Sequence, residues 1–163
     1  RIIEEELKGT ELTLILEPGS VIVGNSGIFV TKLLYIKKVP GKTFYIVDGA
    51  MNDLVRPSLY GAFHEIVSVR YNDAKKINVD VVGPVCESGD FLAKDRDMPL
   101  VESGELLAVL SAGAYGFSMS SNYNSRRRVA EVLVRDAEFN VIKSRETLKD
   151  LIKGEKIPSF MEV

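Results

Sequence analysis

The segment from Pro84 to Phe91 contains the only cysteine of the chain, and a carboxylate follows it directly in the order Cys86-Glu87. A lone cysteine cannot form an intramolecular disulfide, and one Cys with one His does not make a zinc site, so we predict no metal centre. The thiol is then either a small buried hydrophobic group or a group that acts in acid, base or nucleophilic chemistry. Glycines on both sides of the pair place it on a loop, and functional groups concentrate on loops held by a rigid scaffold. The rest of the sequence has to decide between these roles.

Three further stretches could contact a ligand. Arg56 and Tyr60 offer a cation and a phenol on either side of a proline, although Arg56 could equally be a solvated surface residue. Tyr115 has glycines nearby on both sides, which indicates close approach of the backbone to another strand or to a planar ligand. Gly19 and Ser20 follow an apolar run and could offer backbone N–H groups to an anion.

The elements that must position these residues are mostly strands. A helix that ends at Gly9 and a continuous apolar run over residues 12–16, which predicts a buried strand, are typical of the end of a βα barrel. From there on, turn signals every eight to twelve residues indicate a β sandwich or barrel with short helical pieces. We expect strands at 27–37, 43–48, 66–70, 77–82, 106–110, 129–134 and 139–142, and a helix at 146–154.

Composition limits the class of protein. The chain has 163 residues, 45% of them hydrophobic, and a net charge of -2, so it is one domain or a piece of something larger, and nucleic acid is not an expected partner. The short basic cluster Arg126–Arg128 is expected to be solvated or salt-bridged. The apolar runs are too short to span a bilayer and no signal peptide is evident, so we predict a cytoplasmic protein that does not bind membranes.

Several motifs together, in the same order, resemble the C-terminal half of the diaminopimelate decarboxylases, pyridoxal-phosphate enzymes of lysine biosynthesis. The motifs are Glu17-Pro18-Gly19-Ser20, Asp48-Gly49-Ala50-Met51-Asn52-Asp53, Arg56-Pro57-Ser58-Leu59-Tyr60, Cys86-Glu87-Ser88-Gly89-Asp90, Gly113-Ala114-Tyr115-Gly116 and Ser121-Asn122-Tyr123-Asn124. The resemblance implies the C-terminal β-barrel or sandwich domain of a fold type III decarboxylase. Residues 1–26 would form the end of an otherwise missing βα barrel, including its last strand, and residues 27–163 would form the β domain.

The same resemblance implies roles for individual residues. Cys86 resembles the residue that gives a proton after carbon dioxide leaves, and a thiol suits that step because its reference pKa is about 8.5. Glu87 resembles the residue that holds the distal ammonium of the substrate, and Arg56 and Tyr60 resemble contacts to its carboxylate. Tyr115 resembles a residue that lies against both cofactor and substrate.

The cofactor would be pyridoxal phosphate, with Glu17, Gly19 and Ser20 in its phosphate loop. The family usually has arginine where this chain has Ser20, so one charged contact is missing. The family's cofactor lysine lies in its N-terminal barrel and has no counterpart here, so this chain alone is expected to be inactive. The expected assembly is a homodimer with shared active sites.

Two alternatives stay open at this point. One is a decarboxylase of the same fold that acts on ornithine, arginine or a polyamine precursor, which Arg56 disfavours because those substrates have no second carboxylate. The other is a non-catalytic homologue that only forms dimers.

Overall fold

The computed structural model describes residues 2–70 and 73–161, and most of its regular structure is β. The strands are β1 (Phe29–Val39), β2 (Lys42–Val47), β3 (Ile66–Ser68), β4 (Lys76–Val82), β5 (Phe91–Pro99), β6 (Leu106–Val109), β7 (Glu131–Arg135) and β8 (Glu138–Lys143). The α-helices are α1 (Ile2–Glu6), α2 (Arg56–Tyr60) and α3 (Leu148–Leu151), and four short 3-10 helices are η1 (Gly24–Ser26), η2 (Phe117–Met119), η3 (Tyr123–Ser125) and η4 (Ser159–Met161). The mostly β fold class predicted from the sequence is confirmed.

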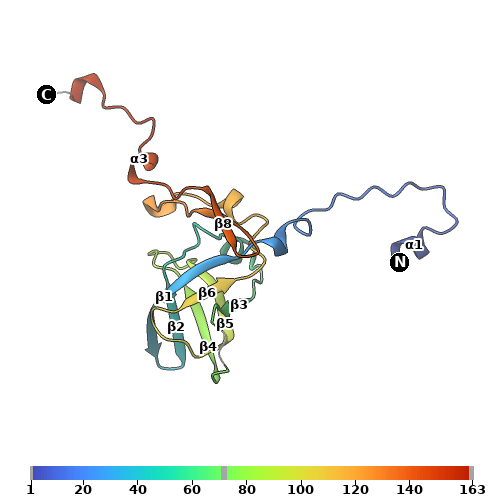
Figure 1. Cartoon of the computed structure of the whole chain (residues 1–163), viewed down its shortest axis with the longest axis horizontal. Coiled ribbons are helices and arrows are strands. Elements are labelled where there is room, and N and C mark those ends of the chain that lie inside the picture. The colour runs from blue at the N-terminus through green and yellow to red at the C-terminus, as the bar shows by residue number, and fades with distance from the viewer. Residues whose placement is uncertain (1, 71–72, 162–163) are drawn as a thin grey trace.

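Six strands form one sheet in the order β3-β6-β1-β2-β4-β5. The predicted antiparallel hairpin of β1 and β2 is confirmed, and Gly41 supplies the positive φ of 77° at its turn. The pairing of β2 with β4 is parallel, so the chain must cross over between them, and α2 and β3 lie on that connection. The crossover places α2 in contact with β5, an edge strand of the sheet. Figure 1 shows how the strands of the barrel are arranged.

The two edges of this sheet approach each other, so the sheet is a nearly closed barrel. Arg96 on β5 donates from Nη1 to the carbonyl oxygen of His64, which precedes β3, at 2.9 Å. The Arg96 guanidinium also lies 3.9 Å from the centroid of the Phe63 ring. These contacts join the edge strands without a backbone ladder, and the barrel encloses the core.

The core consists of inward-facing side chains of the six strands and of loop residues such as Leu54 and Val101. Its largest fully buried members are Tyr45, Leu33, Leu54, Leu92, Met98 and Leu107. The burial of β1 alternates at Thr31 and Leu33, as expected for a strand with one face on a core. A rigid scaffold of this kind can hold the loops at its rim in fixed positions.

The second sheet is the hairpin of β7 and β8, which was also predicted. Most of its apolar side chains, among them Val134 and Phe139, are exposed. Lys143 of β8 lies 4.4 Å from the ring centroid of Phe117 in η2, and this contact attaches the hairpin to the loops above the barrel.

The structure contradicts the buried strand predicted for residues 12–16. Leu12, Ile15 and Leu16 are each exposed, and the segment has no strand pairing. Figure 1 shows it as an arm that leads from α1 to the barrel. An apolar run is buried as a strand only when neighbouring strands pair with it and other elements cover both faces, and β1–β6 pair among themselves.

Smaller differences concern other elements. The charged segment that forms β5 was not predicted as a strand, because its alternation is hidden by Lys94, Asp95 and Asp97. The helix predicted over 146–154 is shorter, and it starts after the N-cap Thr147, whose backbone N–H and hydroxyl both bond to Asp150. The turn predicted at Asn72-Asp73 lies partly outside the described residues. None of the helices in the described ranges has the length and apolar character needed to cross a membrane.

Candidate functional site

Helix α2 carries the predicted cation and phenol, and its Arg56 lies near both the Tyr60 and the Tyr115 rings. The Arg56 guanidinium carbon lies 5.6 Å from the ring centroid of Tyr60 and 5.2 Å from that of Tyr115. Arg56 and Tyr60 are four residues apart, so they share one face of the helix. Both distances are within the range of cation–π attraction, and Arg56 is half-buried while both rings remain exposed. The structure therefore unites three of the predicted substrate-contact residues.

The backbone around Tyr115 explains its glycines. Tyr115 itself adopts a positive φ of 59°, a conformation that costs energy for a side chain with a Cβ. A Cβ at Gly113 would overlap the carbonyl oxygen of Val23, and the Gly113 N–H donates to the Gly24 oxygen at 3.0 Å. The close backbone approach predicted here is confirmed, and it is made to the segment that follows Ser20.

A cavity of about 240 Å³ lies beside Arg56. Its lining includes Ser20, Asn25, His64, Ser111 and Ala114. His64 is buried, and its Nδ1 lies 2.9 Å from the carbonyl oxygen of Leu110. Hydroxyl groups and a guanidinium are groups that hydrogen-bond phosphate or carboxylate oxygens, so the lining suits an anionic ligand.

The other predicted phosphate-loop residues lie at the base of the exposed arm. Glu17, Gly19 and Ser20 are exposed, and a turn follows in which Ile22 donates to the Gly19 oxygen at 3.1 Å and Gly24 to the Ser20 oxygen at 2.6 Å. Of these three residues, Ser20 lines the cavity beside Arg56. The structure does not bring Glu17 to that lining.

The cysteine loop is exposed but held firmly by Asp90. The Asp90 carboxylate is buried, and its two oxygens accept hydrogen bonds from the Met51 N–H and the Val85 N–H, each at 2.7 Å. A Cβ at Gly83 would overlap this carboxylate, so only glycine fits there. From the other side, the Ser58 hydroxyl of α2 donates to the Gly89 carbonyl oxygen. Cys86 is exposed at the tip of this fixed loop.

Glu87 has a partner that was not predicted. Its Oε1 accepts the Gly89 N–H at 3.0 Å, and its Oε2 lies 3.4 Å from the hydroxyl of Tyr123 in η3. Cys86, Glu87 and Tyr123 are all exposed, so these groups are open to a ligand or to another chain.

A buried polar network fixes the loop that carries Tyr123. Arg126 donates from Nε to the Asn52 side-chain oxygen at 2.8 Å and from Nη2 to the carbonyl oxygen of Asp48, and it forms an ion pair with Asp53 at 3.6 Å. Burial raises the pKa of Asp53, and the Ala50 N–H, followed by Arg126, acts in the opposite direction. The basic cluster was predicted to be solvated or salt-bridged. Arg126 is salt-bridged, and its partner Asp53 is buried.

The predicted residues form two groups around α2. Arg56, Tyr60 and Tyr115 are held together by the contacts of the Arg56 guanidinium. Cys86 and Glu87 lie on the loop that bonds to Ser58, which is two residues from both Arg56 and Tyr60 in the helix and so does not share their face. Within the described part of the chain, no hydrogen bond or ion pair joins Cys86 or Glu87 to the first group.

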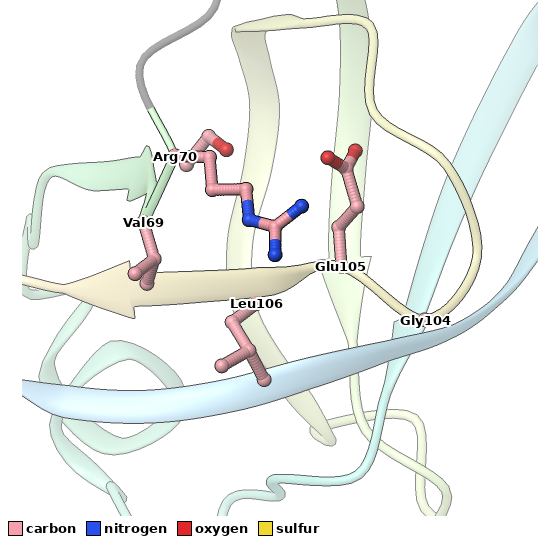
Figure 2. A pocket seen from close by; sticks show the side chains of 6 residues that line it. Val69, Arg70, Gly104, Glu105 and Leu106 are labelled. Carbon is pink, nitrogen blue, oxygen red and sulfur yellow. The ribbon is translucent and has the colours of Figure 1, made fainter.

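A second cavity, also of about 240 Å³, is lined by none of the predicted site residues. It lies over β6 and is lined by Ser68, Val69, Arg70, Gly104, Glu105 and Leu106. Figure 2 shows the Arg70 guanidinium and the Glu105 carboxylate extending into the same space above β6. Glu105 already accepts the Glu102 N–H at 2.7 Å, which is a turn contact and indicates no chemistry. Among the described residues, no group of His, Cys, Asp and Glu side chains could hold a metal ion.

Sequence reasoning missed the residues that support the site. Ser58, Asp90 and Tyr123 lie within the quoted motifs and Arg126 lies in the basic cluster, but none of them was given a role in the site, because most of their partners are distant in sequence. The hydrogen bond from Arg126 to Asn52 joins residues 74 positions apart. Only the Gly-Asp pattern at Gly89-Asp90 indicated a turn beforehand.

Comparison with known proteins gives a consistent result. The family profile described as "Pyridoxal-dependent decarboxylase, C-terminal sheet domain" matches residues 20–113. The chain is 54% identical to diaminopimelate decarboxylase of Pseudomonas aeruginosa over 157 residues, which is 96% of this chain and 38% of that protein. This chain thus spans less than half the length of that relative.

Solved structures agree with the sequence relatives. The crystal structure of diaminopimelate decarboxylase from M. jannaschii matches with a TM-score of 0.88 and 37% identity, covering 99% of this chain and 38% of that one. The enzyme from Helicobacter pylori complexed with L-lysine matches with a TM-score of 0.80 and 47% identity, covering 92% of this chain and 37% of that one.

Proposed function

The chain belongs to the pyridoxal-dependent decarboxylases, whose C-terminal sheet domain it contains, and from this premise we propose that the full-length protein decarboxylates meso-2,6-diaminopimelate to L-lysine. The observation that carries the choice of substrate is the Arg56 guanidinium, half-buried beside the cavity and between two phenols. Diaminopimelate differs from lysine, ornithine and arginine by a second carboxylate, and a guanidinium can hold a carboxylate with two parallel hydrogen bonds.

The residues of this chain fit a phosphate-bearing cofactor in part. Ser20 and Ser111 supply hydroxyls at the cavity, and Tyr115 presents an exposed aromatic ring to Arg56, which lines the cavity. We assign Gly19, Ser20 and Tyr115 to cofactor contacts, with Glu17 adjacent in the chain. Bound pyridoxal phosphate would take up the electron pair that remains when carbon dioxide leaves.

The proton chemistry falls to Cys86. Its thiol is exposed on a loop fixed by Asp90, so it can present a proton to a reacting carbon without a change in the scaffold. Arg56 and Tyr60 orient the distal carboxylate, and Glu87 accepts hydrogen bonds from the distal ammonium. A reduced thiol is required, which supports a cytoplasmic location.

The separation of the two groups supports a homodimer with shared active sites. One chain would supply Arg56, Tyr60 and Tyr115 to each site, and the second chain would supply Cys86 and Glu87. A mixing experiment tests this arrangement. Cys86→Ala and Arg56→Met subunits, each strongly impaired alone, should on unfolding and refolding together regain about a quarter of wild-type activity, because about half of the dimers are mixed and each holds one intact site. No recovery in verified mixed dimers would place both groups in one chain's site.

The reaction itself is tested with the full-length protein and pyridoxal phosphate. Carbon dioxide release and lysine formation from diaminopimelate should exceed release from ornithine or arginine. Equal or greater release from ornithine would return the assignment to the related decarboxylases, and no release from any substrate would favour the non-catalytic homologue.

A further inference from the structure

We propose that Tyr123 is a positioning residue that determines specificity through Glu87, by holding the Glu87 carboxylate in the orientation that receives the distal ammonium of the substrate. This inference rests on the proposed function. It concerns a residue outside both groups assigned above, and it starts from the contact between the Tyr123 hydroxyl and Glu87 Oε2.

The first step is the geometry at the carboxylate. Glu87 is exposed, and an exposed glutamate ordinarily samples several rotamers, so a ligand that needs one of them must restrict the others at an entropic cost. Here the Gly89 N–H bonds to Oε1 at 3.0 Å, and the Tyr123 hydroxyl reaches Oε2 at 3.4 Å. One donor on each oxygen fixes the plane of the carboxylate, and free lone pairs remain on both oxygens for an ammonium.

The second step is the rigidity of the segment that carries Tyr123. The Ser121 N–H donates to the Asn52 carbonyl oxygen at 2.9 Å, and Arg126 binds the Asn52 side chain, so η3 is anchored on both sides to one residue. Asn124 and Ser125 have positive φ values of 58° and 54°. Two consecutive residues in this region persist only when surrounding contacts enforce them, and such strain gathers at functional sites.

The third step is the chemistry of the phenol. A tyrosine hydroxyl is an uncharged donor, so it bonds to Glu87 without cancelling the carboxylate charge. A lysine or arginine at this place would form an ion pair and compete with the substrate ammonium. A neutral donor orients the carboxylate and leaves its charge for the ligand.

The test compares two substrates in the full-length enzyme with its cofactor. Diaminopimelate carries the distal ammonium, and 2-aminopimelate keeps the distal carboxylate but lacks that ammonium. Tyr123→Phe removes only the hydroxyl. It should lower kcat/KM for diaminopimelate about three- to tenfold, the range for one modest hydrogen bond, with most of the change in KM. It should leave kcat/KM for 2-aminopimelate within about twofold, because no ammonium needs Glu87 there.

The outcomes separate the possible failures. Equal losses for both substrates would mean that Tyr123 supports the fold alone and would overturn the inference, as would no loss for either. A wild-type enzyme inactive on diaminopimelate would overturn the proposed function and the inference with it. Tyr35→Phe makes the same chemical change at an exposed position on β1 and should change kcat/KM for neither substrate. In Glu87→Gln the further change Tyr123→Phe should have no additional effect, since the two residues act as one unit.

Discussion

Asp90 joins the cysteine loop to the turn before α2, because its Oδ1 accepts the Met51 N–H at 2.7 Å. The other oxygen accepts the Val85 N–H at the same distance, and the carboxylate is buried. Backbone groups that would otherwise be unpaired are thus satisfied by a single charged side chain. The position of Cys86 consequently depends on a residue four positions further along the chain.

Asp90→Asn should loosen this loop. The amide has one acceptor oxygen where the carboxylate has two, so one of the two N–H groups loses its partner, at a cost of about 1–3 kcal/mol. Hydrogen exchange of amides 83–90 in the full-length protein should become faster, while that of β1 should not change. Asp97→Asn, on the exposed part of β5, serves as the control. Unchanged exchange in residues 83–90 would mean that Asp90 does not hold the loop.

The sequence was sufficient to predict the elements whose pattern is local. β1 and β2 are joined by a Pro-Gly turn and show strand-like composition, so the hairpin could be identified before its register was known. The parallel pairing of β2 with β4 could not, because the crossover depends on contacts between segments more than 30 residues apart. The apolar pattern of residues 12–16 indicates a buried strand, but burial also requires neighbours that β1–β6 do not provide.

The candidate site likewise has residues that the sequence could identify and contacts that it could not. Motif resemblance selected Arg56 and Tyr115, and the structure places them 5.2 Å apart from guanidinium carbon to ring centroid. The contact of Tyr123 with Glu87 crosses 36 residues and has no local signature. Supporting hydrogen bonds of this kind emerge only from the tertiary fold, since a tyrosine or an aspartate in a loop has many possible partners.

The pH dependence of the hairpin attachment should follow Glu146. The Arg128 N–H, and next the Asn122 side chain, lower the pKa of Glu146 below its ordinary value of 4.5. A carboxyl whose pKa is lower in the folded state stabilises the fold above its unfolded pKa, and this contribution is lost as the pH falls through the folded pKa. Wild type should therefore be more stable than Glu146→Gln at pH 7, and the difference should shrink as the pH falls below 4.5 and through the lower folded pKa.

Urea unfolding of the full-length protein, followed by circular dichroism at pH 7 and at pH 3.5, measures this difference. Glu138→Gln, on the exposed strand β8, is the matched control and should show no such dependence. A gap between wild type and Glu146→Gln that is as large at pH 3.5 as at pH 7 would assign the effect to packing and not to charge.

Cys86→Ala should slow the chemical step of the full-length enzyme. A positioned general acid contributes about 10²- to 10⁴-fold to the rate, so kcat should fall by that factor while the cofactor remains bound. Single-turnover kinetics and the absorbance of the bound cofactor measure the two effects separately. Turnover at the parent rate would show that Cys86 is a structural thiol. Ser88→Ala, in the same loop, controls for disturbance of the backbone.

Arg56→Met should change the choice of substrate. The guanidinium is the cation beside the cavity, and a hydrogen bond to a charged group contributes about 1.5–3 kcal/mol, so kcat/KM for diaminopimelate should fall by about one to two orders of magnitude. Lysine offered as a substrate keeps the distal ammonium but lacks the distal carboxylate, so its slow use should be nearly unaffected. Glu87→Gln should instead weaken the use of both, since both present the ammonium.

Steady-state kinetics of the two variants with the two substrates decide the matter. Arg127→Met, which removes an exposed arginine outside both groups, should leave kcat and KM for both substrates unchanged. If Arg56→Met uses diaminopimelate as well as wild type does, Arg56 does not grip the second carboxylate. Arg56 would then only orient the rings of Tyr60 and Tyr115. A substrate without a second carboxylate, such as ornithine, would again fit the site as well as diaminopimelate.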